Sequence, residues 1–288
     1  MNTLLRNEPM SKHTSWRLGG PADLYFRPDS VEALCDFLRD LDDTVEIHWT
    51  GLGSNLLVRD GGIRGAVITP AKALGNLQRL ESGLVEAGAG VPCTTLARRC
   101  TLWGLGPAEF FAGIPGTVGG ALNMNAGAFG GETWDRVVEV DTVDRTGKIR
   151  TRPNTDFDVA YRQVRGPADE WFIAARFKFA EQEEISLDRV PALMKERQRS
   201  QPLGLASCGS VFRNPPGQYA AQLIEASELK GYRVGGAIVS EKHANFIINT
   251  GDATAADVEA LIGHIRSTVQ NRHGIKLELE VHIIGEPE

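Results

Sequence analysis

The hydrophobic and polar positions of the first 180 residues predict short strands that alternate with helices. Apolar side chains recur at helical spacing over residues 31–41, and Asp29 and Ser30 precede them as capping residues. Runs that favour β-structure lie at residues 45–49, 56–58, 66–68, 84–87, 137–143 and 171–179. In the last of these runs the apolar residues alternate, which places them on one face of a strand. The pattern predicts a mixed α+β region that extends to about residue 180.

A second region is expected after a polar run at residues 181–184. Helices are expected at residues 186–199 and 218–227, and strands at residues 246–249 and 277–284. The clearest helix begins at Thr254, has Asp257 at the capping-box position and ends at Gly274. We therefore predict one domain over residues 1–180, with subdomains of about 1–70 and 71–180, and a C-terminal domain over residues 185–288.

Composition and charge narrow the class of protein. The 288 residues carry a net charge of −6, so the strong positive field of a nucleic-acid-binding protein is missing. Residues 110–131 are uncharged, but seven glycines make them a poor membrane helix. The four cysteines have neither metal-ligand nor disulfide spacing, and the first twelve residues lack the apolar stretch of a signal peptide. We expect a cytoplasmic protein that binds no metal, no nucleic acid and no membrane.

Two glycine-rich segments are the candidates for ligand binding. Residues 50–55, Thr-Gly-Leu-Gly-Ser-Asn, lie between two expected strands, where backbone N–H groups can form an anion-binding nest. An ordinary tight turn explains this segment equally well. The second segment, residues 113–127, is longer than a turn requires and suggests a backbone that presses against a large flat or phosphate-bearing ligand, although a glycine-rich packing loop is the alternative. The chain has no Rossmann or P-loop motif, and no histidine or cysteine in these segments could hold a flavin covalently.

Eight motifs in fixed order give the chain a family resemblance. They are KHTSWRLGGPA at residues 12–22, GLGSN at 51–55, FAGIPGTVGGA at 111–121, YR at 161–162, GSVFRNP at 209–215, KGY at 230–232, SEKHANF at 240–246 and LELEV at 277–281. With these motifs the whole chain resembles the UDP-N-acetylenolpyruvoylglucosamine reductase (MurB) family, in its shorter class. The resemblance implies a two-part FAD-binding region of the vanillyl-alcohol-oxidase (PCMH) type, followed by a smaller α+β substrate-binding domain.

The resemblance also implies a reaction. It is the NADPH-dependent reduction of UDP-N-acetylglucosamine enolpyruvate to UDP-N-acetylmuramate in peptidoglycan precursor synthesis, with non-covalent FAD, by a monomer without an obligate protein partner. Residues implied to bind FAD are Gly51, Gly53, Ser54, Asn55, Leu56, Ile114, Pro115, Gly116, Thr117, Gly119, Gly120, Asn125, Ala126 and Gly127. Substrate-binding residues are Tyr161, Arg213, Asn214 and Lys230. Ser210 is implied as the proton donor, and Arg162 and Glu280 as its assistants at the substrate carboxylate and developing enolate.

Ordinary roles compete with each catalytic assignment. From sequence alone Ser210 could be a turn or cap serine and Arg162 a surface arginine, while Glu280 could lie on a solvated strand face. The chain also departs from the family pattern: Val164 stands where serine is frequent, Cys208 where alanine is frequent and Arg213 where lysine is frequent. Two other functions remain open, a related FAD oxidase or dehydrogenase and a flavin- or nucleotide-binding protein without catalysis. The joint presence of Ser210, Arg162 and Glu280 argues against the last.

Overall fold

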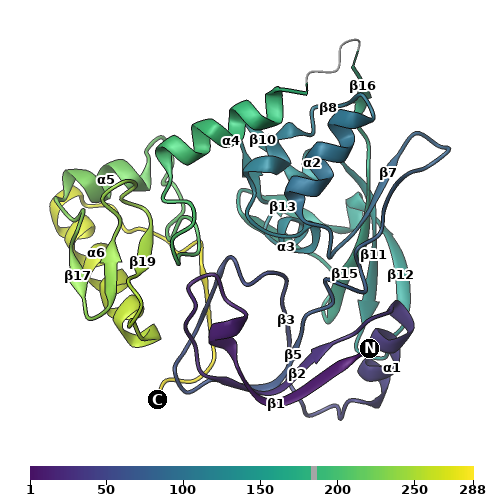
Figure 1. Ribbon diagram of the computed structural model, residues 1–288, viewed down its shortest axis with the longest axis horizontal. Coiled ribbons are helices and arrows are strands. Elements are labelled where there is room, and N and C mark those ends of the chain that lie inside the picture. The colour runs from purple at the N-terminus through teal and green to yellow at the C-terminus, as the bar shows by residue number, and fades with distance from the viewer. Residues whose placement is uncertain (183–186) are drawn as a thin grey trace. The chain divides into compact units, whose positions relative to one another are not determined.

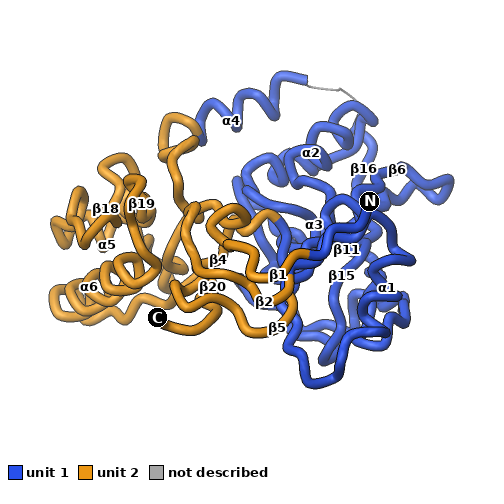
Figure 2. Tube along the Cα trace, turned by 60° about the horizontal axis from the view of Figure 1, so that its bottom comes forward, with its two compact units in different colours: residues 1–4, 25–51, 67–197 blue, residues 5–24, 52–66, 198–288 orange. Residues whose placement is uncertain are grey.

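The computed structural model describes residues 1–182 and 187–288, which form two compact units (Figure 2). Unit 1 comprises residues 1–4, 25–51 and 67–197, and unit 2 comprises residues 5–24, 52–66 and 198–288. These units divide the chain differently from the sequence, because two N-terminal segments group with the C-terminal residues. The functional domains 1–180 and 185–288 stay a prediction. The end of the expected linker, the expected domain start at residue 185 and the expected helix start at residue 186 lie outside the described residues.

A five-stranded antiparallel sheet forms the centre of unit 1 (Figure 1). Its order is β12 (Ile149–Pro153), β11 (Val137–Asp144), β15 (Glu170–Phe177), β7 (Val85–Gly88) and β6 (Leu77–Arg79). Alternate residues of β15 are buried, at positions 173, 175 and 177, which confirms the predicted strand. Helices α2 (Cys93–Leu102) and α3 (Val118–Asn123) and the 3₁₀ helix η2 (Glu109–Gly113) share the core with this sheet. In that core the ring of Phe111 meets the ring of Phe177 edge-on at 5.6 Å.

A second sheet has the order β1 (Thr3–Pro9), β2 (Pro21–Arg27), β5 (Ile63–Ile68) and β3 (Ile47–Trp49). The limits of the two units fall within β1, β2 and β5, so each of these strands contributes residues to both. Helix α1 (Val31–Asp40) belongs to unit 1 and buries Leu34 and Leu38. The Ser30 side chain accepts a hydrogen bond from the Ala33 N–H at 3.1 Å, as the predicted cap requires.

Unit 2 is built around its longest helix, α6 (Ala255–His273), which the sequence predicted in full. Thr254 and Asp257 form the capping box, and Gly274 ends the helix with a left-handed φ of 71°. Packed with it are α5 (Ala220–Ala226) and the antiparallel strands β17 (Arg233–Val234), β18 (Ala237–Val239) and β19 (Ile247–Asn249) (Figure 1). Strand β20 (His282–Ile284) pairs in parallel with β4 (Leu56–Val58).

The strand expected over residues 277–284 is wrong for residues 277–281. Leu279 makes an isolated bridge with Phe212, while the N–H groups of Glu280 and Val281 both point to the Val211 carbonyl, at 2.8 and 3.4 Å. Two donors on one acceptor cannot continue a regular ladder. Only residues 282–284 therefore form a strand.

Short elements complete the described chain. The strands are β8 (Leu105–Gly106), β9 (Gly127–Ala128), β10 (Gly131–Glu132), β13 (Asp158–Ala160), β14 (Gln163–Arg165) and β16 (Ala180–Glu181). The helices are η1 (Met10–Lys12), η3 (Thr133–Asp135), η4 (Asn154–Asp156) and α4 (Arg189–Ser200). In the part of the chain that the structure describes, no helix combines the length and apolar character needed to cross a bilayer.

Candidate functional site

The two glycine-rich segments meet in unit 1, at Gly51 and Thr117. A Cβ added to Gly51 would lie only 2.8 Å from Thr117 Oγ1, so a side chain at this position would push the segments apart. Thr117 caps α3 with a hydrogen bond that its Oγ1 accepts from the Gly120 N–H at 3.5 Å. At Gly120 the nearest atom to an added Cβ is 4.0 Å away. Together these residues form a backbone surface with few side chains, as a large flat ligand requires.

Backbone hydrogen bonds also hold the second glycine-rich segment against residues 89–93. The Gly119 N–H donates to the Ala89 carbonyl at 2.8 Å, and a Cβ on Gly119 would lie 2.9 Å from Ala89 Cβ. The Cys93 N–H donates to the Gly116 carbonyl at 2.9 Å. The predicted FAD-binding residues 114–120 are thus anchored on the turn that leads into α2.

The remainder of the first segment, from Gly53 to Leu56, lies in unit 2. Gly53 has a φ of +61°, and a Cβ there would lie 2.1 Å from the His13 carbonyl oxygen, so only glycine fits. Asn55 donates its side-chain N–H to the Glu280 carbonyl at 2.9 Å, and its own carbonyl accepts from the His282 N–H at 3.0 Å. A predicted cofactor residue therefore contacts the backbone of a predicted catalytic residue.

Ser210 and Glu280 are also brought together within unit 2. The Glu280 N–H donates to the carbonyl of Val211, the residue after Ser210, at 2.8 Å. Asn245 clamps the same segment, because its side chain accepts from the Phe212 N–H at 3.0 Å and donates to the Phe212 carbonyl at 2.8 Å. The two residues that follow Ser210 are thus fixed by hydrogen bonds from Glu280 and Asn245.

Cys208 lies buried beneath this arrangement. Its thiol donates to the carbonyls of Gly53 and Leu56, at 3.5 and 3.4 Å. Burial raises the pKa of the Cys208 thiol to about 12, so the group stays protonated and acts as a donor rather than a nucleophile. The other three cysteines are also buried, as free thiols.

Arg162 lies in unit 1 and is not a surface arginine, because its side chain is 15% exposed. Its Nη1 donates to the Asn125 carbonyl at 3.2 Å and its Nη2 to the Gly127 carbonyl at 3.0 Å. The guanidinium carbon lies 4.8 Å from the Tyr161 ring centre. Arg162 and Asn125 both have left-handed backbones, with φ of 56° and 43°, a conformation that costs of order 1 kcal/mol for a residue such as arginine. The two hydrogen bonds and the contact with the Tyr161 ring together hold this arginine in place.

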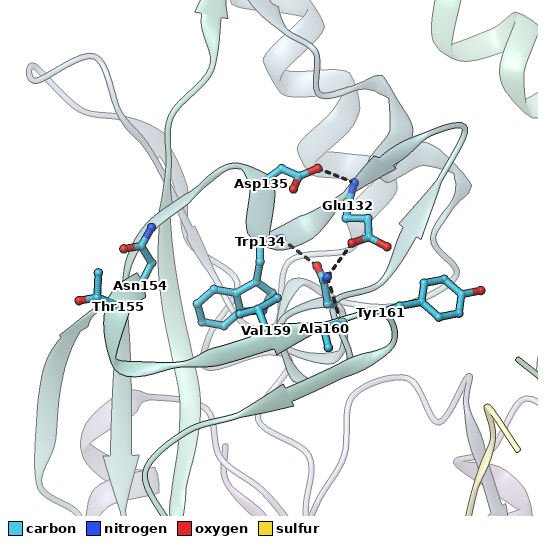
Figure 3. Close-up of a pocket in the computed structure, with 9 residues that line it drawn as sticks. Glu132, Trp134, Asp135, Asn154, Thr155, Val159, Ala160 and Tyr161 are labelled. Carbon is cyan, nitrogen blue, oxygen red and sulfur yellow. Dashed lines mark hydrogen bonds between the residues drawn. The ribbon is translucent and has the colours of Figure 1, made fainter. Parts of the chain in front are cut away.

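A hollow of about 600 Å³ is lined by Tyr161, the residue before Arg162, and by Asn125, whose carbonyl accepts from Arg162 (Figure 3). Its lining residues are Asn125, Glu132, Trp134, Asp135, Asn154, Thr155, Val159, Ala160 and Tyr161. Figure 3 shows the Tyr161 ring directed away from Trp134 and Val159. Glu132 links the hollow to the arginine, since its carboxylate accepts from Asn125 Nδ2 at 2.8 Å and lies 3.7 Å from Arg162 Nη1.

The residues predicted to bind substrate have varied surroundings. Lys230 pairs with Glu225 at 2.6 Å, and the Asn214 side chain accepts from the N–H of Ala220, the first residue of α5, at 3.0 Å. The Arg213 N–H donates to the Glu278 carbonyl at 2.9 Å, so this residue follows Ser210 along the same fixed segment.

Sequence reasoning missed Glu132 and Asn245. The signal for Glu132 was available, because it is the first charge after the uncharged stretch of residues 110–131. Asn245 stood inside a family motif, but its partner Phe212 is 33 residues away and could not be inferred from spacing.

Comparison with known proteins defines the class first. The family model for an FAD-binding domain matches residues 22–152, which include the cradle of glycines and Thr117. The model for the C-terminal domain of UDP-N-acetylenolpyruvoylglucosamine reductase matches residues 201–284. The chain is therefore an FAD-binding protein, and the predicted fold class is confirmed.

Relatives over nearly the whole length specify the family. The UDP-N-acetylenolpyruvoylglucosamine reductase of Alkalilimnicola ehrlichii is 57% identical over 98% of this chain and 94% of its own, and that of Methylococcus capsulatus is 52% identical over 99% and 94%. The crystal structure of the enzyme (MurB) from Thermus caldophilus has a TM-score of 0.83, with 32% identity over 98% of both chains. The chain belongs to the UDP-N-acetylenolpyruvoylglucosamine reductase family and is an FAD-dependent oxidoreductase.

Proposed function

We propose that this chain reduces the enolpyruvyl group of UDP-N-acetylglucosamine enolpyruvate to UDP-N-acetylmuramate, with NADPH as the electron donor. The observation that carries the proposal is Arg162, a guanidinium held by two backbone carbonyls next to the predicted cofactor residues Asn125 and Gly127. We assign the FAD to the glycine-rich segments at Gly51 and Gly120, and their backbone surface with few side chains supports this choice. When bound, FAD would supply the hydride carrier of the reaction. A protein that only stored flavin would not need an arginine fixed in this way.

The reduction of an enol ether that bears a carboxylate requires a proton donor and a counter-charge for the developing enolate. We assign the proton to Ser210 Oγ, and the carboxylate and enolate to Arg162, assisted by Glu280. A serine hydroxyl is a weak acid, so it can donate only to a strongly basic centre in a preorganised site. The bonds of Asn245 to Phe212 and of Glu280 to Val211 support this assignment, because they fix the backbone directly after Ser210 and none of them uses the serine hydroxyl.

The remaining assignments concern substrate recognition. Tyr161, Arg213, Asn214 and Lys230 are proposed to bind the nucleotide sugar, with the cations directed at its diphosphate. Arg213 in place of lysine keeps the charge and adds a planar, bidentate geometry for phosphate. We further propose that the protein is a cytoplasmic monomer and that its product serves cell wall biogenesis, and through it cell shape and division.

The experiment that tests the proposal is an anaerobic absorbance titration of the purified holoprotein. NADPH is added first and UDP-N-acetylglucosamine enolpyruvate second, while the oxidised-flavin band is followed. We expect bleaching and then recovery. Bleaching without recovery would refute the proposed substrate. Sustained turnover with oxygen as the acceptor and without NADPH, in a separate aerobic assay, would indicate an oxidase.

A further inference from the structure

Glu132 occupies the end of a hairpin whose geometry directs it at the arginine. Strands β9 and β10 pair Gly127 with Glu132 and Ala128 with Gly131. A Cβ on Gly127 would lie 2.4 Å from the Gly131 carbonyl and 3.1 Å from Glu132 Cγ, so glycine is required for this close pairing. The hairpin thus places the Glu132 side chain beside the residue whose carbonyl accepts from Arg162 Nη2.

The carboxylate of Glu132 reaches Arg162 by two routes. Directly, its Oε1 lies 3.7 Å from Arg162 Nη1. Indirectly, its Oε2 accepts from Asn125 Nδ2 at 2.8 Å, and the Asn125 carbonyl accepts from Arg162 Nη1 at 3.2 Å. Both routes end on the same guanidinium nitrogen.

Both polar atoms of the Asn125 side chain have hydrogen-bond partners in this network. Its Nδ2 also approaches the Ala160 carbonyl, at 3.3 Å, and its Oδ1 accepts from the Trp134 N–H at 3.1 Å. The side chain is therefore held in one orientation, with Glu132 as its charged partner. A neutral amide at position 132 could accept the same hydrogen bond, but it would give up the attraction to the guanidinium.

We propose that Glu132 is a positioning residue for the reduction, which orients Arg162 toward the substrate carboxylate. The inference rests on the proposed function, since it assumes the role of Arg162. Glu132 itself contacts no reacting atom. Its removal should leave the NADPH step intact and impair only the binding and reduction of the enolpyruvyl nucleotide.

The test compares Glu132→Gln with Glu170→Gln in FAD-loaded protein. Glu170 pairs with Arg152 at 2.6 Å in the same unit, so the control neutralises another glutamate that faces an arginine, at a pair of shorter distance and outside the network around Arg162. Calorimetric titration with the enolpyruvyl nucleotide measures binding to the oxidised protein, and stopped-flow absorbance separates the two half-reactions. We expect Glu132→Gln to weaken binding and slow the second half-reaction about tenfold each, with flavin reduction by NADPH changed less than twofold. Wild-type values for Glu132→Gln, or an equal loss in Glu170→Gln, would overturn the proposal.

A double-mutant cycle with Arg162→Ala separates this inference from the proposed function. If Glu132 acts through Arg162, Glu132→Gln has no further effect once the arginine is gone. An equal effect in both backgrounds refutes the positioning role. If Arg162→Ala alone reacts like the wild type, the proposed role of the arginine fails instead. Should Glu132→Gln lose FAD or not fold, Glu132→Asp is used instead, because it keeps the charge but withdraws it by one methylene. This variant must slow the second half-reaction relative to the wild type; a wild-type rate contradicts the proposal.

Discussion

Replacement of Asn245 by alanine removes two hydrogen bonds from one buried residue, Phe212. The Asn245 side chain is 3% exposed, and it pairs with both the N–H and the carbonyl of Phe212, at 3.0 and 2.8 Å. Phe212 is 1% exposed, so water cannot easily replace the lost partner. The alanine variant thus leaves one donor and one acceptor buried without these bonds.

The expected loss of stability follows from these two groups. A buried polar group without its partner costs about 1–3 kcal/mol, so the pair gives about 3 kcal/mol in the free energy of unfolding. For a chain of 288 residues, that corresponds to a fall in melting temperature of roughly 5 °C. Because Phe212 lies two residues after Ser210, the loss of both side-chain bonds also loosens the backbone that carries Ser210, and we expect a slower second half-reaction.

The assay combines denaturant unfolding with stopped-flow absorbance, and Asn249→Ala is the control. The Asn249 side chain donates to the Trp16 carbonyl at 2.8 Å and accepts from the Gly251 N–H at 2.8 Å, so the variant removes two hydrogen bonds that do not involve Phe212. The control should lose stability without a slower second half-reaction. A loss below about 1 kcal/mol in Asn245→Ala would refute the reasoning from burial.

Three further predictions concern the site and the sheet. Ser210→Ala should slow the second half-reaction at least about a hundredfold and spare flavin reduction by NADPH, as stopped-flow absorbance will show. Gly51→Ala, whose Cβ would lie 2.8 Å from Thr117 Oγ1, should weaken FAD binding about tenfold in a fluorescence titration. Burial raises the pKa of Asp144, but hydrogen bonds from Thr146 and Arg150 outweigh it and lower the pKa from 3.8 to about 2. The ionised Asp144 carboxylate therefore stabilises the fold above pH 4 by about 2 kcal/mol, and this contribution is lost between about pH 4 and 2. In Asp144→Asn, the free energy of unfolding measured against pH should fall less steeply over that range.

Locally encoded elements were the ones that the sequence could predict. Helix α6 has its cap, its apolar stripe and its terminal glycine within twenty-one consecutive residues, from Thr254 to Gly274, and each signal agrees with the others. Helix α1 has Ser30 directly before it. No distant contact is needed to place the limits of either helix.

The grouping of residues 5–24 and 52–66 with unit 2 could not be predicted, because it depends on remote partners. The Trp16 indole donates to the Ile247 carbonyl at 2.8 Å, across 231 positions of sequence. Asp60 accepts from the Ala255 and Ala256 N–H groups, both at 2.9 Å, and so supplies acceptors to the start of α6 from 195 and 196 positions away. Neither tryptophan nor aspartate carries a sequence signal for such a partner.

The site divides in the same way. Its glycines and Arg162 were available from motifs, whereas Glu132 and Asn245 act only through residues that folding brings near. The alternating apolar positions of residues 277–281 predicted a strand that does not form. The N–H groups of Glu280 and Val281 both point to the Val211 carbonyl, and Leu279 makes only an isolated bridge. Irregular backbone of this kind is common where a scaffold presents functional groups, because a regular ladder would occupy the N–H and carbonyl groups in another way.

Cys208 connects the segment before Ser210 with the first glycine-rich segment. The position requires a small side chain, since it is buried among the carbonyls of Gly53 and Leu56. Alanine would satisfy the size alone, whereas the thiol also donates weakly to both carbonyls. With its pKa raised to about 12, the thiol keeps this proton at every physiological pH. The Cys208 thiol thereby links the residues just before Ser210 to the carbonyls of Gly53 and Leu56. A backbone without the thiol would lack this donor.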